Sequence, residues 1–136
     1  MLDRPARHAA ERIGAALTGL AELAGPGTEN GDLLALLTLC EAAARRIDRL
    51  LVGALAEVER RGVFVERGYS SSAAALGDLV GWDRAEARLR LAAAPLVRPR
   101  LGLDGTPLPP RLPATAAVFE AGEASLRHVE VVARLL

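Results

Sequence analysis

The chain has 136 residues, of which 51% are apolar and only 3% aromatic, and its seventeen arginines are balanced by seventeen acidic residues, with no lysine. Such a length is enough for one domain with a real core. Alanine and leucine dominate and strand-forming residues are scarce, so the composition predicts an all-α fold. A net charge of zero argues against a uniformly basic nucleic-acid binder.

The apolar segments indicate a cytoplasmic protein without membrane contact. The N-terminal stretch is interrupted by Glu11, Arg12 and Glu22, so it lacks the apolar core of a signal peptide. The longest near-apolar run, "LLALLTLC", is too short to cross a bilayer. Its cysteine, Cys40, is the only one in the chain, which excludes a disulfide framework and predicts a small buried hydrophobic residue.

Two helices are predicted in the first half of the chain. Asp3 followed by Pro5 begins the first, and "GPGTENG" ends it. The second is long, about 45 Å from Asp32 to Gly62, and is expected to be the central helix of the fold. Its apolar stripe consists of Leu33, Leu37, Cys40, Ala44, Ile47, Leu51, Leu55 and Val58. An extended link, "VFVERGYSS", is expected to follow and to supply an aromatic core residue, Phe64 or Tyr69.

Glycines and capping residues mark two helical corners in the second half. Ser71 or Ser72 begins a helix that ends at Gly81, and Asp83 with Glu86 forms a capping box for the next helix, which runs to about Pro95 or Arg98. Gly122 and Ser125 repeat the pattern of a glycine followed by a capping residue. The predicted architecture is therefore an irregular all-α bundle with two helix-turn-helix-like corners.

Between these corners, residues 99–113 are rich in proline and glycine. They predict an irregular or polyproline link with a turn at Asp104–Gly105, and Pro113 then begins a short helix. The last helix is expected to run through Leu136 without a cap. We interpret residues 1–136 as one helical domain cut from a longer protein.

The corner at Gly81 resembles the turn of a DNA-reading helix-turn-helix. Gly77 and Gly81 have the required spacing, and the predicted apolar supports are Leu76, Val80 and Trp82. Past Ala87 the match is poor, because Arg90 stands near a position that is usually apolar. Arg90 is instead expected to pair with Glu86, four residues before it.

Arginines concentrate after this corner. Residues 84–111 contain six arginines against Glu86 and Asp104, whereas residues 1–83 carry a net charge of −3. Arg84 and Arg88 share one helical face and are predicted to contact phosphates or a guanine edge. A secondary basic patch is predicted from Arg98, Arg100 and Arg111. The alternative is a plain helical corner that only packs against its neighbours.

No catalytic, metal or cofactor site is expected. His8 and His128 are the only histidines, and with one cysteine and one asparagine they assemble neither a four-ligand zinc site nor a His-Asn-His nuclease site.

Four segments together resemble a known family. They are "RGYSSSAAALGDLVG", "RAEARLRLA", "LPPRLPAT" and "GEASLRHVEVVA". The chain from about Leu33 onward is similar to the N-terminal domain of actinobacterial 13E12-repeat proteins, domain of unknown function 222 (DUF222). The resemblance implies a helical domain that is followed by an HNH endonuclease module.

From these residues and the resemblance we expect a non-catalytic, DNA-associated domain that positions such a nuclease. The alternative is an interaction or oligomerisation module without DNA contact, whose partner is a further segment of the protein or another copy of the chain.

Overall fold

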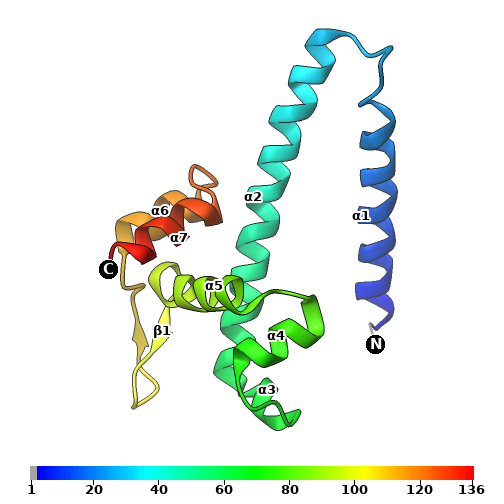
Figure 1. The fold of residues 1–136 in the computed structure, drawn as a ribbon. Coiled ribbons are helices and arrows are strands. Elements are labelled where there is room, and N and C mark those ends of the chain that lie inside the picture. Colours follow the sequence, from blue (N-terminus) through cyan, green and yellow to red (C-terminus); the bar gives the residue numbers. More distant parts are fainter. Residues whose placement is uncertain (1–2) are drawn as a thin grey trace. The chain divides into compact units, whose positions relative to one another are not determined.

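The computed structural model describes residues 3–136, and it is all-α apart from two strands of two residues each. The helices are α1 (Arg4–Glu22), α2 (Asn30–Arg61), α3 (Val63–Glu66), α4 (Ser72–Val80), α5 (Arg84–Val97), α6 (Pro113–Glu120) and α7 (Leu126–Arg134). The chain divides into two compact units, residues 1–43 and residues 44–136, and Figure 1 shows the elements of each. Each unit is described separately below.

The first unit contains α1 and the first part of α2. Asp3 caps α1 by accepting a hydrogen bond from the Ala6 amide at 3.0 Å, as the sequence predicts. The connecting loop is closed by Thr28, whose hydroxyl donates to the Leu23 carbonyl at 2.5 Å. The second helix begins at Asn30, two residues before the predicted start. No residue from 3 to 43 is buried, so the prediction of a buried Cys40 is wrong.

The second unit is organised around α5, which packs against α4, α6 and α7. Alanines at its contact positions, Ala87, Ala93 and Ala94, are buried and allow neighbouring helices to approach closely. The remainder of α2 contributes Val52 and Leu55, its only buried residues within the described chain. Of the predicted apolar stripe of α2, only Leu55 is buried, and it lies in the core of the second unit.

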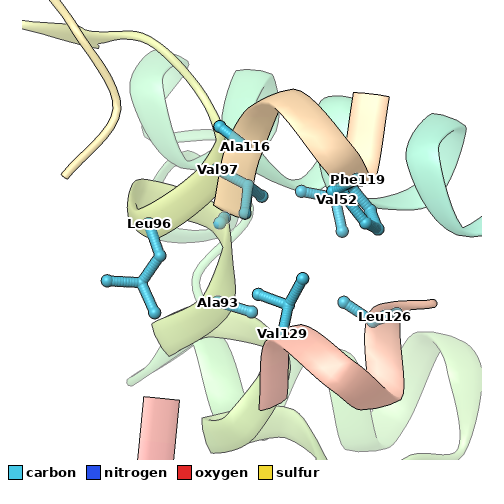
Figure 2. Packing of buried hydrophobic residues seen from close by; sticks show 9 residues of the cluster. Val52, Ala93, Leu96, Val97, Ala116, Phe119, Leu126 and Val129 are labelled. Carbon is cyan, nitrogen blue, oxygen red and sulfur yellow. The ribbon is translucent and has the colours of Figure 1, made fainter. Parts of the chain in front are cut away.

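The core of the second unit has two parts, both of which include α5. One part joins residues of α2, α5, α6 and α7 and is drawn in Figure 2: Val52, Ala93, Ala94, Leu96, Val97, Ala116, Phe119, Leu126 and Val129. The other joins Leu55, Phe64, Ala75, Leu76 and Ala87. Phe64 and Tyr69 both pack there, with their rings 6.4 Å apart and nearly perpendicular.

Two links differ from their predictions. The segment after α2 is the short helix α3 rather than an extended link, and this turn of helix places Phe64 in the core. Within residues 99–113, β1 (Arg100–Leu101) pairs antiparallel with β2 (Pro107–Leu108). The predicted turn at Asp104–Gly105 closes this hairpin, because the Asp104 side chain accepts from the Thr106 amide and Gly105 has a φ of 82°.

Both predicted corners are present. At the first, Gly81 ends α4 with a φ of 74°, and Asp83 accepts from the Glu86 amide at 2.7 Å to begin α5. At the second, Gly122 has a φ of 77° and Ser125 caps α7. The expectation that the last helix runs through Leu136 is wrong, since α7 ends at Arg134 with Leu135 as its cap.

The second corner is attached to α2 by polar contacts. The Arg45 guanidinium donates to the Gly122 carbonyl at 2.9 Å, and the Asp48 carboxylate accepts from the Leu126 amide at 3.4 Å. A carboxylate at this helix N-terminus is favourable because the first amides of α7 have no partner within the helix.

Candidate nucleic-acid interface

Three of the predicted arginines lie on one face of α5 and its C-terminal cap, and this face is exposed at its first two arginines and half-buried further along. Arg84 and Arg88 are followed at helical spacing by Leu91, Pro95 and Arg98. At 1.5 Å per residue, the stripe from Arg84 to Arg98 is about 21 Å long. This is about the length of six base-pair steps of B-DNA along one strand.

Arg84 and Arg88 are both exposed. Within residues 3–136 neither guanidinium forms an ion pair or a hydrogen bond. Arg84 is the first residue of α5, where the helix dipole disfavours a positive charge, so its charge does not stabilise the helix. Two guanidinium groups one helical turn apart are thus available to an anionic ligand.

The same stripe leads into a groove of about 520 Å³ between α2, α5 and β1. Its floor is largely apolar and includes Ala56, Leu91 and Pro95. Arg98, Arg100 and Arg60 lie among the lining residues, so the structure brings two predicted arginines together with one that the sequence analysis missed. Glu57 and Glu59 line the groove as well, so its charged side chains are three arginines and two glutamates.

Each predicted groove arginine already has a polar contact. Arg98 forms an ion pair with Glu120 at 3.3 Å, and the Nε of Arg100 donates to the Pro109 carbonyl at 3.2 Å. Arg111 is exposed but does not line the groove, although its backbone amide bonds the Pro95 carbonyl at 3.2 Å. The predicted secondary patch is therefore divided: two of its members share the groove and the third lies outside it.

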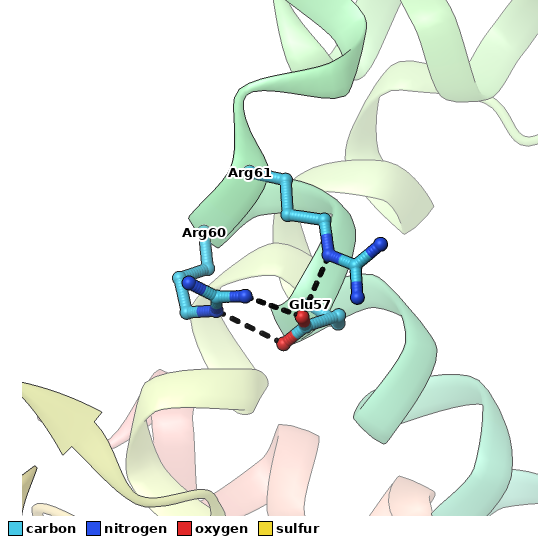
Figure 3. A network of polar contacts seen from close by, with 3 residues as sticks. All are labelled: Glu57, Arg60 and Arg61. Carbon is cyan, nitrogen blue, oxygen red and sulfur yellow. Dashed lines mark hydrogen bonds and ion pairs between the residues drawn. The ribbon is translucent and has the colours of Figure 1, made fainter.

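The Glu57 carboxylate forms an ion pair with Arg60, the third arginine of the groove. Figure 3 shows its carboxylate accepting from Arg60, with the Nε of Arg60 at 3.0 Å, and from the Nε of Arg61 at 2.7 Å. Hydrogen bonds from these two guanidinium groups lower the pKa of Glu57 from 4.5 to about 2. Glu57 is therefore ionised at every pH above that range and competes with any external anion for Arg60. Glu57 and Arg61 lie four residues apart on α2, the spacing at which side chains of one helix meet.

Arg90 lies on the other side of α5, where it contacts α7 and is 23% exposed. It pairs with Glu86 at 3.0 Å, as predicted, and also with Glu130 of α7 at 3.7 Å. Its guanidinium carbon lies 4.2 Å from the centre of the Trp82 ring, a cation–π contact. Helix-turn-helix motifs usually have an apolar residue at this position. Here an arginine is tolerated because the carboxylates of Glu86 and Glu130 and the face of Trp82 compensate its charge.

Replacing Arg90 with alanine is expected to lower the free energy of unfolding by about 2 kcal/mol, since it leaves the largely buried Glu130 carboxylate without its partner. Urea unfolding followed by the fluorescence of Trp82, the only tryptophan, measures this loss. Arg88→Ala on the same helix is the control and should change the value by less than about 0.5 kcal/mol. Equal losses in the two variants would contradict the role assigned to Arg90.

Comparison with known proteins identifies the family of this fold. The model of the family described as "Domain of unknown function (DUF222)" matches residues 34–136, which include every element of the second unit. The chain belongs to the DUF222 family. The DUF222 match begins inside α2, so α1 lies outside it.

Relatives of this DUF222 domain occur in Mycobacterium tuberculosis. The chain is 34% identical over 101 residues to the uncharacterized protein Rv1128c, covering 74% of this chain and 22% of that protein. It is 35% identical over 104 residues to the uncharacterized protein Rv1702cMb1728c, again covering 74% and 22%. The chain thus spans less than a quarter of the length of these relatives. No solved structure matches it.

The described part of the DUF222 chain was also compared with the requirements of a membrane span and of a metal site. Between residues 3 and 136, no helix is both long and apolar enough to span a bilayer. In the same residues, no group of three or more His, Cys, Asp or Glu side chains is placed to hold a metal ion.

The sequence pattern did not indicate two of the residues described above: Arg60, which lines the groove, and Glu130, which pairs with Arg90. Arg60 is close to Arg98 only because the end of α2 lies beside the end of α5. Glu130 meets Arg90 only because α5 and α7 pack together. Both contacts join residues that are far apart in the sequence, so the sequence pattern around Arg60 and Glu130 could not reveal them.

Proposed function

We propose that this DUF222 domain is a non-catalytic module that binds the phosphate backbone of DNA through the arginine stripe of α5. The observation that carries the proposal is the availability of Arg84 and Arg88, which are exposed and have no carboxylate partner in the described chain. Arg98 continues the stripe at the mouth of the groove. In a longer protein the domain would position an HNH endonuclease module, as the family resemblance implies.

The arrangement favours phosphate contact over base reading. Arg84 and Arg88 reach outward from one face, whereas Arg90, at the position where such a motif buries an apolar residue, is engaged by Glu86 and Glu130. Phosphate contacts fix the position of a protein on DNA and carry no sequence information. We therefore expect weak selectivity among duplex sequences.

The salt dependence of binding tests this proposal. With about three phosphate contacts per chain, the affinity for duplex DNA should fall about 40-fold between 50 and 200 mM salt. Fluorescence anisotropy of a labelled duplex, titrated at several salt concentrations, measures the slope. Absence of binding at 50 mM salt, or binding that salt does not affect, would refute the proposal.

Glu57→Gln is expected to strengthen DNA binding several-fold, because it removes the carboxylate that holds Arg60 at the groove. The slope against salt should steepen by up to about 1, the contribution of one further phosphate contact. Glu66→Gln is the matched control, since Glu66 is exposed on α3 and makes the same change in net charge. If both variants bind equally well, Arg60 does not contact the DNA.

A further inference from the structure

The first unit lacks a core of its own, although its helices have the pattern of buried ones. Within it, α1 and the start of α2 run antiparallel and are joined by residues 23–29 (Figure 1). Ile13 and Leu17 of α1 are 54% and 55% exposed, and Leu37 of α2 is 68% exposed. No side chain between residues 3 and 43 is buried.

The apolar residues of both helices follow a spacing of alternately three and four, which is that of a coiled-coil seam. In α1 these residues are Ala6, Ala10, Ile13, Leu17 and Leu20, and in α2 they begin with Leu33, Leu37 and Cys40. Such a seam packs against another helix with the same spacing. The partner of this surface is therefore helical.

The start of α2 is apolar on nearly all sides. Thr38 is the only polar residue from Leu33 to Cys40, and its hydroxyl donates to the Leu34 carbonyl at 3.2 Å, which satisfies it within the helix. A helix that is apolar all round is normally surrounded by other helices or by lipid. The seam spacing favours helices as the surroundings of this segment, because lipid tails impose no such spacing on the residues that face them.

Charge along the unit points to a second copy as the partner. Residues 13–44 contain four acidic residues and no basic one, and three of the four, Glu22, Glu29 and Asp32, lie near the loop. The opposite end carries Arg4, Arg7 and Arg12 against Asp3 and Glu11, a net charge of +1. The two ends are about 27 Å apart along α1, too far to pair within one chain.

We propose that two copies of the chain associate through their first units to form an antiparallel four-helix bundle. The loop end of each copy, with Glu29 and Asp32, then lies beside Arg4 and Arg7 of the other. This two-fold arrangement buries both seams and pairs opposite charges at both ends. The inference is independent of DNA binding, since it uses no residue of the α5 stripe.

Sedimentation equilibrium of the full chain tests the dimer. We expect twice the chain mass of 14.3 kDa at tens of micromolar, without DNA. Leu37→Glu should yield a monomer with unchanged helical circular dichroism. Leu103→Glu, at a fully exposed residue of the hairpin turn, should remain a dimer. A monomeric wild-type chain, or a dimer that Leu37→Glu does not weaken, would overturn the proposal.

Charge reversal tests the antiparallel orientation. Arg4→Glu with Arg7→Glu in one chain, or Glu29→Arg with Asp32→Arg in another, should each weaken self-association at least tenfold by placing like charges together. Mixing the two variants should restore a dimer that contains one copy of each. Unchanged helical circular dichroism of both variants would show that loss of the dimer does not come from unfolding of α1. Failure of the mixture to associate would overturn the antiparallel arrangement.

Discussion

Phe119→Ala is expected to lower the free energy of unfolding of the second unit by about 3–5 kcal/mol, the largest effect on stability of any substitution considered for this chain. Phe119 lies on α6, is 0% exposed and is the largest fully buried side chain in the described residues. Its neighbours in the core include Val52 of α2, Val97 of α5 and Val129 of α7, so the ring joins four helices (Figure 2). Alanine would leave a cavity shared by all four.

Helices packed through alanines cannot easily close such a cavity. Ala93, Ala94 and Ala116 already bring the backbones close together, so further approach would require the helices themselves to shift. Domains of this size are stable by only about 5–15 kcal/mol, and the variant would therefore lose a large share of its stability. We expect α2, α5, α6 and α7 to unfold in one cooperative transition.

Urea unfolding followed by Trp82 fluorescence and by circular dichroism measures the change. The midpoint should fall by about 2 M for an m value near 2 kcal/mol/M, with m itself unchanged. Phe119→Leu should recover much of the loss because it fills most of the volume. Leu103→Ala, at a fully exposed position, should stay within about 0.5 kcal/mol of wild type. A loss below about 1 kcal/mol for Phe119→Ala would contradict the packing of α6 described above.

Replacing both Arg84 and Arg88 with alanine is expected to reduce the affinity for duplex DNA at least tenfold at 50 mM salt. Each substitution should lower the slope of log affinity against log salt by about 1, because an arginine that no longer neutralises a phosphate no longer releases its counterion. The fold should be unaffected, since both side chains are exposed and alanine favours the helix at both positions.

A control with the same loss of charge separates the α5 stripe from general electrostatic attraction. Arg67→Ala with Arg127→Ala removes two exposed arginines of the second unit that lie outside this stripe. Their loss should change the affinity by less than threefold and leave the slope nearly unchanged. Equal effects of the two double variants would mean that the domain binds DNA by its overall charge, and the assignment of Arg84 and Arg88 would then be wrong.

Local signals in the sequence were sufficient for most helix boundaries. Asp3, Ser71, Asp83 and Ser125 each begin a helix because their side chains accept a bond from an otherwise unpaired amide of the first turn. Gly81 and Gly122 end helices because the left-handed conformation costs glycine little. The pair formed by Arg90 and Glu86 was predictable for the same reason, since helical geometry alone brings residues four apart together.

The packing of distant segments was not predictable in this way. The sequence indicated α2 as the central helix, yet α5 is the helix on which the second unit is built, because its alanines let three other helices approach it. The pattern of α2 described a continuous apolar stripe but could not indicate that Leu55 is its only buried residue. Likewise, the pairing in the hairpin of residues 100–108 depends on a register that its glycines and prolines did not reveal.

In the candidate interface, too, some features were predictable from the sequence and others depended on tertiary packing. The sequence alone determined that Arg84 and Arg88 share an exposed face, because both the N-terminal cap and the helical period are local properties. Tertiary structure decided that Arg60 joins Arg98 and Arg100 at a groove, and that Glu130 reaches Arg90. These groupings depend on how helices distant in sequence pack, and that packing follows from the side-chain volumes in the core, which no local pattern records.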